Sequence, residues 1–395
     1  MVLMLLSSSL AATLQVGPGA YVTVQDAVNA ASPGDTIQIE PGVYAGNTLV
    51  TTPDLSFEGS GLGVTRINGK VTIEADSTWR DLTLWPSSAR TNLYVDDATV
   101  TLYNVELLRN VGNQPLIETA FLGDTEVTLE DCWLHDTTAD TAISAIAGDT
   151  TKVVLRRTLV EGIVAHDAPI FVRADDAVLR ILDTTMKDNE GDLASAVFLV
   201  TNDNNDSRLK VDRSVFQNNV GAGNTAVIDV EFNWPHDSRI QRNVFQDNSG
   251  GPALRATVDS YYYGYGYFGP ATMLVRGNTF VSNENATGPS AIECPDRVHL
   301  WVTNNIFMDG VGTAVHTGNL LQQLDYNLYW GNTGDVSPGS VGANAVLADP
   351  MFVDWSNDGD PSNDDLTLLP GSPAFQAGNP LYLLGGVPRN IGASR

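Results

Sequence analysis

Two acidic residues of one short segment, Asp229 and Glu231, are candidates for acid–base chemistry. They alternate with three apolar residues, Ile228, Val230 and Phe232. In an extended strand both carboxylates would lie on the outward face, about 7 Å apart. Carboxylates placed in this way can hold a cation, accept hydrogen bonds or move a proton. Such chemistry needs partners, and these depend on which segments lie beside the strand.

One apolar position recurs along most of the chain at intervals of roughly 22 to 35 residues, the self-similarity typical of a solenoid. Asn, Asp or Gly follows each recurrence within a few residues. The anchor residues are Leu107, Leu134, Val160, Met186, Phe216, Phe245, Phe280, Phe307 and Tyr329. We expect the anchors to point inward and to stack from coil to coil, as an aromatic column where they are phenylalanines.

Short alternating runs such as VTLYNVEL, KVVLRRTL and RLKVDRSVF predict β-strands. Asn, Asp and Gly separate the runs, as tight turns require. Short strands in a repeat of roughly 26 residues describe an all-β parallel β-helix of about eleven coils. Each coil would stack on the next at a spacing of about 4.8 Å.

The one helical pattern lies near the start of the chain. Residues 24–31 place apolar side chains at positions i, i+3, i+4 and i+7, and Thr23 is the expected N-cap. Pro33 and Gly34 follow and end the helix. A short helix at this position would cover the open end of the solenoid core and block edge-to-edge association.

Both ends of the chain carry a family resemblance. The segment VQDAVNAASPGDTIQIEPGVYAGN resembles the opening of right-handed parallel β-helix proteins of the pectin-lyase-like type. The tail, with ADPMFVDW and DLTLLPGSPAFQAGNP, is similar to the C-terminal module of large bacterial surface and secreted β-helix proteins. The resemblance implies a right-handed solenoid in residues 13–348 and a module, continuous with it, in 349–395. It implies no single activity, because this fold carries lyases, glycosidases, epimerases, tailspikes and adhesins.

Alignment of the repeats gives the two acidic residues their partners. Asp229 would lie against Arg255 of the next coil, with Glu293 in the coil after that. Arg173 would lie near the column of Glu231, two coils earlier. Lyases of the pectin-lyase-like type need acidic calcium ligands beside an Arg or Lys base. The resemblance thus implies a catalytic set of Arg173, Asp229, Glu231 and Arg255, with Glu293 as a substrate contact, that binds a uronate and abstracts its α-proton. The alternative is a ladder of surface salt bridges, each worth little.

A candidate calcium loop, DWSNDGDPSNDD, lies in the tail. It resembles the EF-hand loop, with oxygen ligands at alternate positions and Gly at the sharp turn. It departs from that loop in ending on Asp rather than Glu, in containing Pro361 and in lacking flanking helices. The expected calcium ligands are Asp354, Ser356, Asp358, Asp360 and Asp365. Calcium there would stiffen the C-terminal module, and the alternative is a merely solvated acidic loop.

A run of aromatic residues, YYYGYGYF, occupies residues 261–268 within the longest interval between anchors. If the run is extended, Tyr261, Tyr263, Tyr265 and Tyr267 share one face and form a ridge. Such a ridge, emerging just after Arg255, is suited to contact with sugar rings. Packing against the solenoid or self-association remains open as an alternative.

Composition limits the remaining possibilities. The chain carries 47 acidic and 21 basic residues, a net charge of −26, so phosphate backbones repel it and we expect no nucleic-acid partner. Residues 1–12 resemble a signal peptide without a basic start, so we expect an extracellular or cell-surface protein. No later stretch is apolar enough for a membrane helix. Cys132 and Cys294 would lie roughly 24 Å apart along the solenoid, too far for a disulfide, so we expect two free core cysteines.

The sequence therefore leaves three functional hypotheses. The leading one is an exported or surface β-helix protein that binds polysaccharide without necessarily cleaving it. The second is a calcium-assisted lyase of a uronate-containing glycan, and the third is an adhesin with a protein partner. No organic cofactor is implied, because no nucleotide-binding or nucleophile motif is present.

Overall fold

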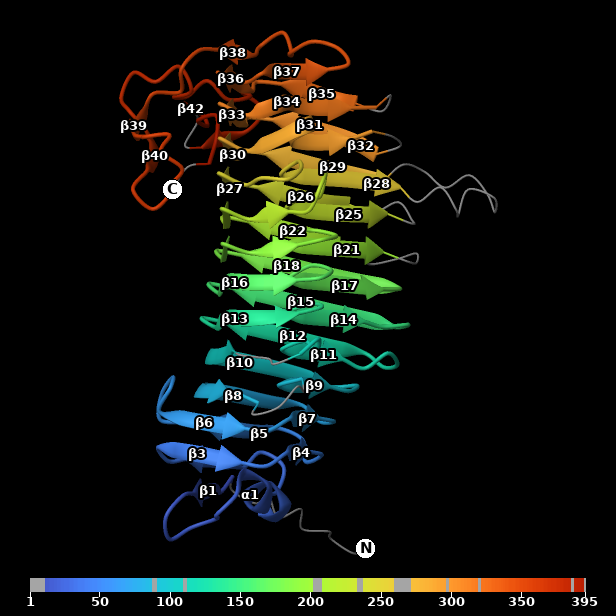
Figure 1. Ribbon diagram of the computed structural model, residues 1–395, viewed down its shortest axis with the longest axis vertical. Coiled ribbons are helices and arrows are strands. Elements are labelled where there is room, and N and C mark those ends of the chain that lie inside the picture. Colours follow the sequence, from blue (N-terminus) through green and yellow to red (C-terminus); the bar gives the residue numbers. More distant parts are fainter. Residues whose placement is uncertain are drawn as a thin grey trace, which may run out of the picture.

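The chain folds as an all-β parallel β-helix of about eleven coils, with one short helix at its N-terminal end (Figure 1). The computed structural model describes residues 11–86, 91–108, 112–201, 208–232, 237–258, 271–295, 298–318, 321–384 and 387–393. Strands of neighbouring coils pair in parallel, in a 26-stranded sheet and a 12-stranded sheet of the described residues. The predicted fold class is confirmed.

Three ladders of strands run along the solenoid, and two of them belong to the larger sheet. The first ladder contains β1 (Thr13–Val16), β2 (Thr36–Ile39), β5 (Leu55–Glu58), β8 (Ser77–Leu84), β10 (Thr99–Leu108), β12 (Thr125–Glu130), β15 (Thr150–Arg156), β18 (Asp176–Leu182), β22 (Arg208–Asp212), β26 (Asp237–Gln241), β29 (Ala271–Arg276), β32 (Val298–Thr303) and β35 (Leu321–Asp325). The second contains β3 (Gly42–Ala45), β6 (Thr65–Asn68), the ends of β8 and β10, then β13 (Trp133–Ala139), β16 (Leu159–Ala165), β19 (Thr185–Lys187), β23 (Val215–Gln217), β27 (Val244–Gln246), β30 (Thr279–Val281), β33 (Ile306–Met308), β36 (Leu328–Trp330) and β38 (Val346–Leu347). The two-residue strands β20 (Glu190–Gly191) and β24 (Val220–Gly221) continue from the end of β16.

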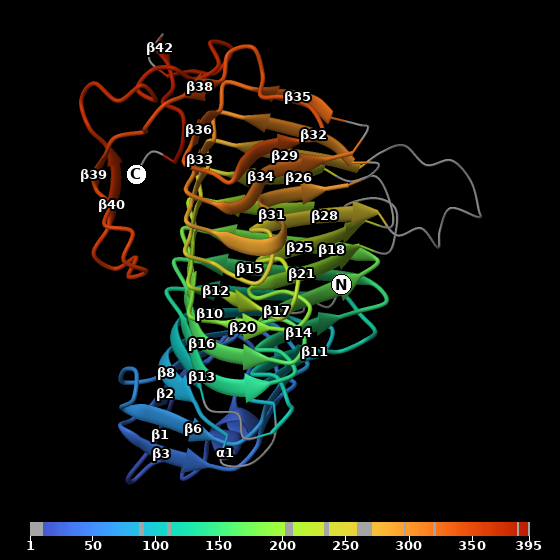
Figure 2. The same cartoon turned by 45° about the horizontal axis from the view of Figure 1, so that its top comes forward.

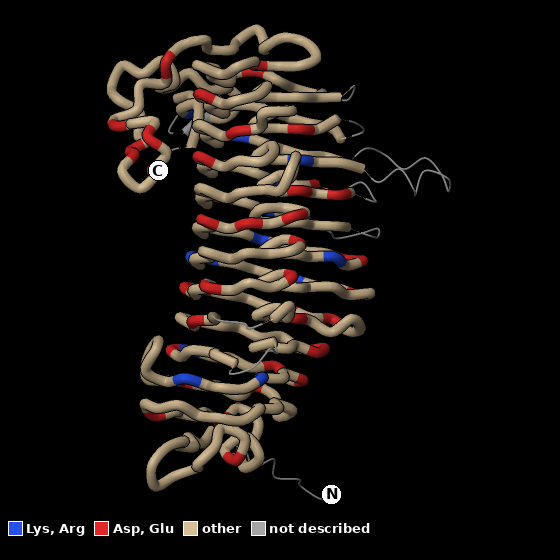
Figure 3. The backbone as a smooth tube through the Cα atoms, in the orientation of Figure 1, with Lys and Arg blue, Asp and Glu red and all other residues tan. Residues whose placement is uncertain are grey.

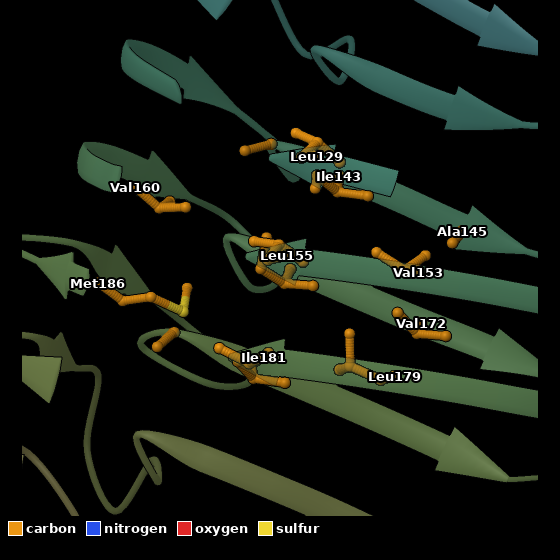
Figure 4. Close-up of a cluster of buried hydrophobic side chains, with 14 of the residues drawn as sticks. Leu129, Ile143, Ala145, Val153, Leu155, Val160, Val172, Leu179, Ile181 and Met186 are labelled. Atoms are coloured by element: carbon orange, nitrogen blue, oxygen red, sulfur yellow. The ribbon is translucent and has the colours of Figure 1, made fainter. Parts of the chain in front are cut away.

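The third ladder is the twelve-stranded sheet, which positions the candidate site. Its strands are β4 (Thr48–Val50), β7 (Val71–Ile73), β9 (Leu93–Val95), β11 (Ile117–Thr119), β14 (Ile143–Ile146), β17 (Ile170–Ala174), β21 (Val197–Thr201), β25 (Ile228–Phe232), β28 (Leu254–Val258), β31 (Glu284–Cys294), β34 (Val311–Thr317) and β37 (Gly334–Ser337). Inward residues of these strands face the same core as the other two ladders. Figure 4 shows aliphatic side chains from several coils packed together there.

The predicted anchors form one continuous inward column. Each anchor pairs in register with the next, from Leu107 with Leu134 to Phe307 with Tyr329, and all are buried. The rings of Phe216 and Phe245 stack with centroids 4.8 Å apart, and the stack continues to Tyr329 with spacings of 4.9 to 5.1 Å. The ring spacing follows the strand spacing because each coil adds one ring.

Buried asparagines form two further columns in the C-terminal half. From the sequence alone these asparagines are expected to be turn residues. One column contains Asn189, Asn219, Asn248 and Asn283, and the other contains Asn243, Asn278, Asn305 and Asn327. Each amide Nδ2 donates to the Oδ1 of the next asparagine at 2.9 or 3.0 Å. The same side chains accept from and donate to the main chain, so buried corner groups are satisfied.

The corner between the first and second ladders requires a left-handed backbone conformation in successive coils. The residues at this corner include Asp183, Arg213, Arg242, Gly277 and Asn304, with φ between 51° and 66°. Asp, Asn and Gly adopt this conformation most readily, which explains why they recur near the anchors.

The ends of the solenoid are covered differently. At the N-terminal end, α1 (Val24–Ala30) has the predicted N-cap, because the hydroxyl of Thr23 accepts a hydrogen bond from the amide of Asp26 at 3.1 Å. The expected signal peptide falls almost wholly in residues 1–10, which lie outside the described residues. Within the described chain no helix is long and apolar enough to span a bilayer. Both cysteines are buried and form no disulfide, as predicted, and burial raises the pKa of Cys132 to about 12.

The C-terminal module follows the last coil and lies along the flank of the solenoid (Figure 2). Its antiparallel hairpin consists of β39 (Phe352–Asp354) and β40 (Asp365–Leu368), and a second hairpin consists of β41 (Leu383–Leu384) and β42 (Val387–Pro388). Phe352, Ala374 and Ile391 pack on outward apolar residues of β30, β33 and β36. The hairpin lies on the opposite flank from β17, β21, β25 and β28 (Figures 1 and 2).

We expect the substitution Asn248→Leu to destabilise the solenoid by about 3 kcal/mol or more. It would leave the carbonyl of Phe216 and the amide of Asn219 without their buried partners. Urea unfolding followed by circular dichroism measures the change, and Lys210→Ala, on the exposed face of a neighbouring coil, is the control. Equal unfolding midpoints for the two variants would show that the asparagine columns contribute little.

Candidate functional site

One set of outward residues of the twelve-stranded sheet forms a column from coil to coil, which we call the outer column. Residues at equivalent positions pair in register from coil to coil. In chain order its members include Ser144, Phe171, Phe198, Asp229, Arg255, Glu293 and His316. The register predicted for Asp229, Arg255 and Glu293 is therefore observed. Alternation along each strand turns these side chains outward while their neighbours fill the core.

Arg255 is held between carboxylates of the two adjacent coils. Its Nη1 lies 3.1 Å from Oδ2 of Asp229, and its Nε lies 2.9 Å from Oε2 of Glu293. Its Nη2 donates to the carbonyl of Asn224. Three contacts on one guanidinium fix its orientation, since its donors form a rigid planar fork. We call Asp229, Arg255 and Glu293 the Arg255 clasp.

Asp229 is the most deeply buried member of the Arg255 clasp. Its side chain is 8% exposed, against 19% for both Arg255 and Glu293. Burial raises the pKa of Asp229 to about 7, although Arg255 acts in the opposite direction. Near neutral pH this carboxyl group is therefore present in both protonation states. It can donate as well as accept a hydrogen bond.

A groove of about 520 Å³ adjoins the Arg255 clasp. Glu293 and His316 lie on one side of it, and the irregular part of β31, residues 285–289, lies on another. Asn285 in this irregular part donates to Oδ1 of Asn224 at 2.7 Å, the residue whose carbonyl accepts from Arg255. Hydrogen bonds thus connect the groove wall to the guanidinium.

Two aromatic residues precede the Arg255 clasp in the outer column. The rings of Phe171 and Phe198 have centroids 5.5 Å apart and planes inclined at 36°. Phe198 pairs directly with Asp229 in the sheet, so the half-buried rings are continuous with the Arg255 clasp. The sequence presents both residues within apolar strands, and only alternation against the inward Val172 and Leu199 distinguishes them from core residues.

The other predicted site residues lie beside the outer column or outside the described chain. Glu231 pairs with Val200, which pairs with the exposed Arg173, so the predicted separation of two coils is observed. These two residues belong to a column neighbouring the Arg255 clasp. The four tyrosines of the predicted ridge, Tyr261, Tyr263, Tyr265 and Tyr267, follow β28 in the chain and lie outside the described residues.

The proposed calcium loop uses its oxygen atoms for hydrogen bonds within the loop. Oδ1 of Asp358 accepts from the amide of Asp360, and Oδ1 of Asp360 accepts from the amide of Ser362. The described residues contain no group of three or more His, Cys, Asp or Glu arranged to hold a metal ion. The predicted ligand set therefore does not converge, and calcium binding stays a prediction.

The same loop meets the solenoid at Asp247. Oδ2 of Asp364 accepts a hydrogen bond from Gln246 at 2.5 Å. Burial and the neighbouring Asp364 raise the pKa of Asp247 to about 6. Two carboxylates close to each other make this contact less favourable as pH rises.

Comparisons with known proteins give no family. No protein-family model matches the sequence, and no curated protein does. Similar solved structures include a PL6 family polysaccharide lyase from Pseudopedobacter saltans, 12% identical, with a TM-score of 0.43 over 96% of this chain and 99% of that chain. They also include the pectate lyase Pel9A, 16% identical, with a TM-score of 0.45 over 98% and 96% of the two chains. Likeness at this level assigns no activity, and the fold stands on the chain's own strand register.

We expect the stability contribution of Asp229 to fall as pH rises from about 4 to about 7. In this window the folded protein keeps a proton on Asp229 that the unfolded chain has released, so rising pH favours unfolding. Asp229→Asn keeps the shape and removes the titration. The stability of wild type relative to this variant should therefore fall by up to about 4 kcal/mol across the window.

Urea unfolding at pH 4, 5.5, 7 and 8 measures this difference. Asp237→Asn, on the exposed start of β26, is the matched control for the loss of one carboxyl group. A constant difference for Asp229→Asn would contradict the raised pKa.

Proposed function

We propose that the protein is an exported β-helix protein that binds a polysaccharide along the outer column of the twelve-stranded sheet. The observation that carries the proposal is the continuity of the Phe171 and Phe198 rings with the Arg255 clasp. Aromatic faces and fixed polar groups occur together where a ligand has both apolar and hydrogen-bonding surfaces.

A sugar ring has such surfaces. Its axial C–H groups pack on an aromatic face, and its hydroxyl groups donate to carboxylate oxygens. The half-buried rings of Phe171 and Phe198 offer the first kind of contact. Glu293 and Asp229 offer the second, next to a groove of about 520 Å³. The strands that carry these residues are hydrogen-bonded on both sides, so the site is organised before a ligand arrives.

The charge of the Arg255 clasp favours a hydroxyl-rich glycan without acid groups. Arg255 already lies beside two carboxyl groups, which weaken its electrostatic attraction for a uronate. The surrounding protein adds to this effect, since its net charge is −26 and acidic residues occur in most coils (Figure 3). An uncharged polysaccharide meets no such repulsion.

We expect Phe198→Ala to weaken binding to the preferred neutral polysaccharide by about tenfold, because it removes the ring that adjoins Asp229. Affinity electrophoresis in gels that contain xylan, mannan, β-glucan or polygalacturonate measures retardation of the protein. Phe375→Ala removes an exposed ring of the C-terminal module and is the matched control. The proposal fails if no gel retards the wild type, or if both variants behave as the wild type does.

Cleavage by a lyase is a second candidate, favoured by the pKa of Asp229. A carboxyl group with a pKa of about 7 is well matched to proton transfer near neutral pH. Arg255 beside it would stabilise the negative charge that develops on a uronate after proton abstraction. In this reading Asp229 is the base and Glu293 contacts the substrate.

Absorbance from unsaturated ends and assay of new reducing ends, in the same tubes, distinguish cleavage from binding. A lyase would release unsaturated product from a uronate-rich polysaccharide, and Asp229→Asn would abolish that product. If cleavage depends on calcium, a chelator would abolish the product too. Reducing ends without unsaturation would indicate hydrolysis. Absence of any product from a polysaccharide that the protein binds would exclude the lyase and leave the binding function.

A further inference from the structure

A second cavity lies where the C-terminal module meets the solenoid, on a different part of the molecule from the Arg255 clasp. It has a volume of about 240 Å³. Residues at the corner between the first and second ladders of three coils line it, together with residues of the chain's last segment. Three arginines line it: Arg242 and Arg276 from the solenoid, and Arg389 from the module. We call it the junction cavity.

Main-chain contacts hold the walls of the junction cavity together. The amide of Asn379 donates to Oδ1 of Asn304 at 2.7 Å, and the amide of Gly392 donates to the carbonyl of Asn304, also at 2.7 Å. Within the module, the amide of Gly378 donates to the carbonyl of Arg389 at 2.9 Å. The cavity is therefore a built feature of the fold, since one buried solenoid residue fixes two points of the last segment.

The two solenoid arginines are oriented by their neighbours. The guanidinium of Arg276 lies over the ring of Tyr382, 4.4 Å from its centroid, and its Nη2 donates to Oε1 of Gln241 at 3.0 Å. Neither contact neutralises its charge. Arg242 donates through Nε and Nη2 to the buried Asp212, at 2.8 and 2.5 Å. The ion pair with Asp212 fixes the orientation of the Arg242 guanidinium through Nε and Nη2, and Nη1 does not take part in it.

Charge around the junction cavity is unbalanced. None of the residues that line it is acidic. Asp212 is shared, because it also lies 3.2 Å from Arg213. Arg389 is exposed and makes no side-chain ion pair within the described chain. Three guanidiniums with one shared carboxylate leave an excess of positive charge, in a protein whose net charge is −26.

We infer that the junction cavity binds the carboxylate group of an acidic sugar. Guanidinium groups bind carboxylates through paired, charge-assisted hydrogen bonds, and two oriented arginines with a third at the rim form a suitable receptor. Amide side chains of Gln241, Gln376 and Asn390 also line the cavity and match sugar hydroxyl groups. The site is independent of the proposed binding along the outer column, which faces away from the module.

Isothermal titration with glucuronate at low salt tests this inference. Glucose lacks the carboxylate, and acetate lacks the sugar, so both serve as ligand controls. We expect glucuronate to bind more tightly than either, and its affinity to fall when sodium chloride is added. Arg389→Ala and Arg276→Ala should each weaken binding by about tenfold or more. Arg239→Ala, on the same strand as Gln241 but outside the cavity, should not change it.

Thermal unfolding separates ligand binding from a structural role. Because Arg389 is exposed and makes no ion pair with the described residues, Arg389→Ala should lose glucuronate affinity while its unfolding temperature stays that of the wild type. Absence of glucuronate binding by the wild type would overturn the inference. Unchanged affinity in both cavity variants would also overturn it. Equal affinity for acetate and glucuronate would overturn the assignment of a sugar ligand.

Discussion

Parallel pairing between coils, repeated in register, is the constraint on which the rest of this structure depends. Each hydrogen-bonded ladder places equivalent residues of successive coils directly beside one another. Each side chain therefore lies between the side chains at the equivalent positions of the preceding coil and the following coil. Inside the solenoid this produces the stack from Phe216 to Tyr329 and the asparagine columns. On the outside of the solenoid the same pairing produces the outer column. The core and the candidate site therefore both result from the register between coils.

Register also explains why the solenoid can bury so many polar groups. An isolated buried amide would be costly, but each asparagine in a column satisfies its neighbour and the main chain at the corner. The column works only if every coil contributes. Thr158, Thr184 and Ser214 precede the column that begins at Asn243. The main-chain amide of each donates a hydrogen bond to the side-chain oxygen of the next residue in this series, Ser214 to Oδ1 of Asn243. Single substitutions within it affect two coils at once, which makes these positions sensitive probes of stability.

Periodic features of the fold could be predicted from the sequence, because a repeat is visible along the chain. The anchors, the separation of Cys132 from Cys294 and the register of Asp229 with Arg255 follow from counting residues between repeats. The N-cap at Thr23 follows from the helical spacing of the apolar residues after it. The sequence does not single out Phe171 and Phe198, because outward aromatic residues within apolar strands resemble core residues. The junction cavity had no sequence signal at all. Arg242 and Arg389 are distant in the chain, and no repeat relates the module to the coils that it covers.

The neighbours of an arginine in the preceding and following coils determine whether its charge is neutralised within the protein. Arg255 has a carboxylate in the coil before it and another in the coil after it, so its charge is used internally and serves to orient Asp229 and Glu293. Arg276 has Gln241 before it and Thr303 after it, and neither neutralises it. The module adds Tyr382 and Arg389 rather than an acid. The same residue type thus orients two carboxylates on one flank and leaves an excess of positive charge at the junction. The two proposed sites would let a strongly acidic solenoid recognise neutral and acidic parts of a glycan at separate places.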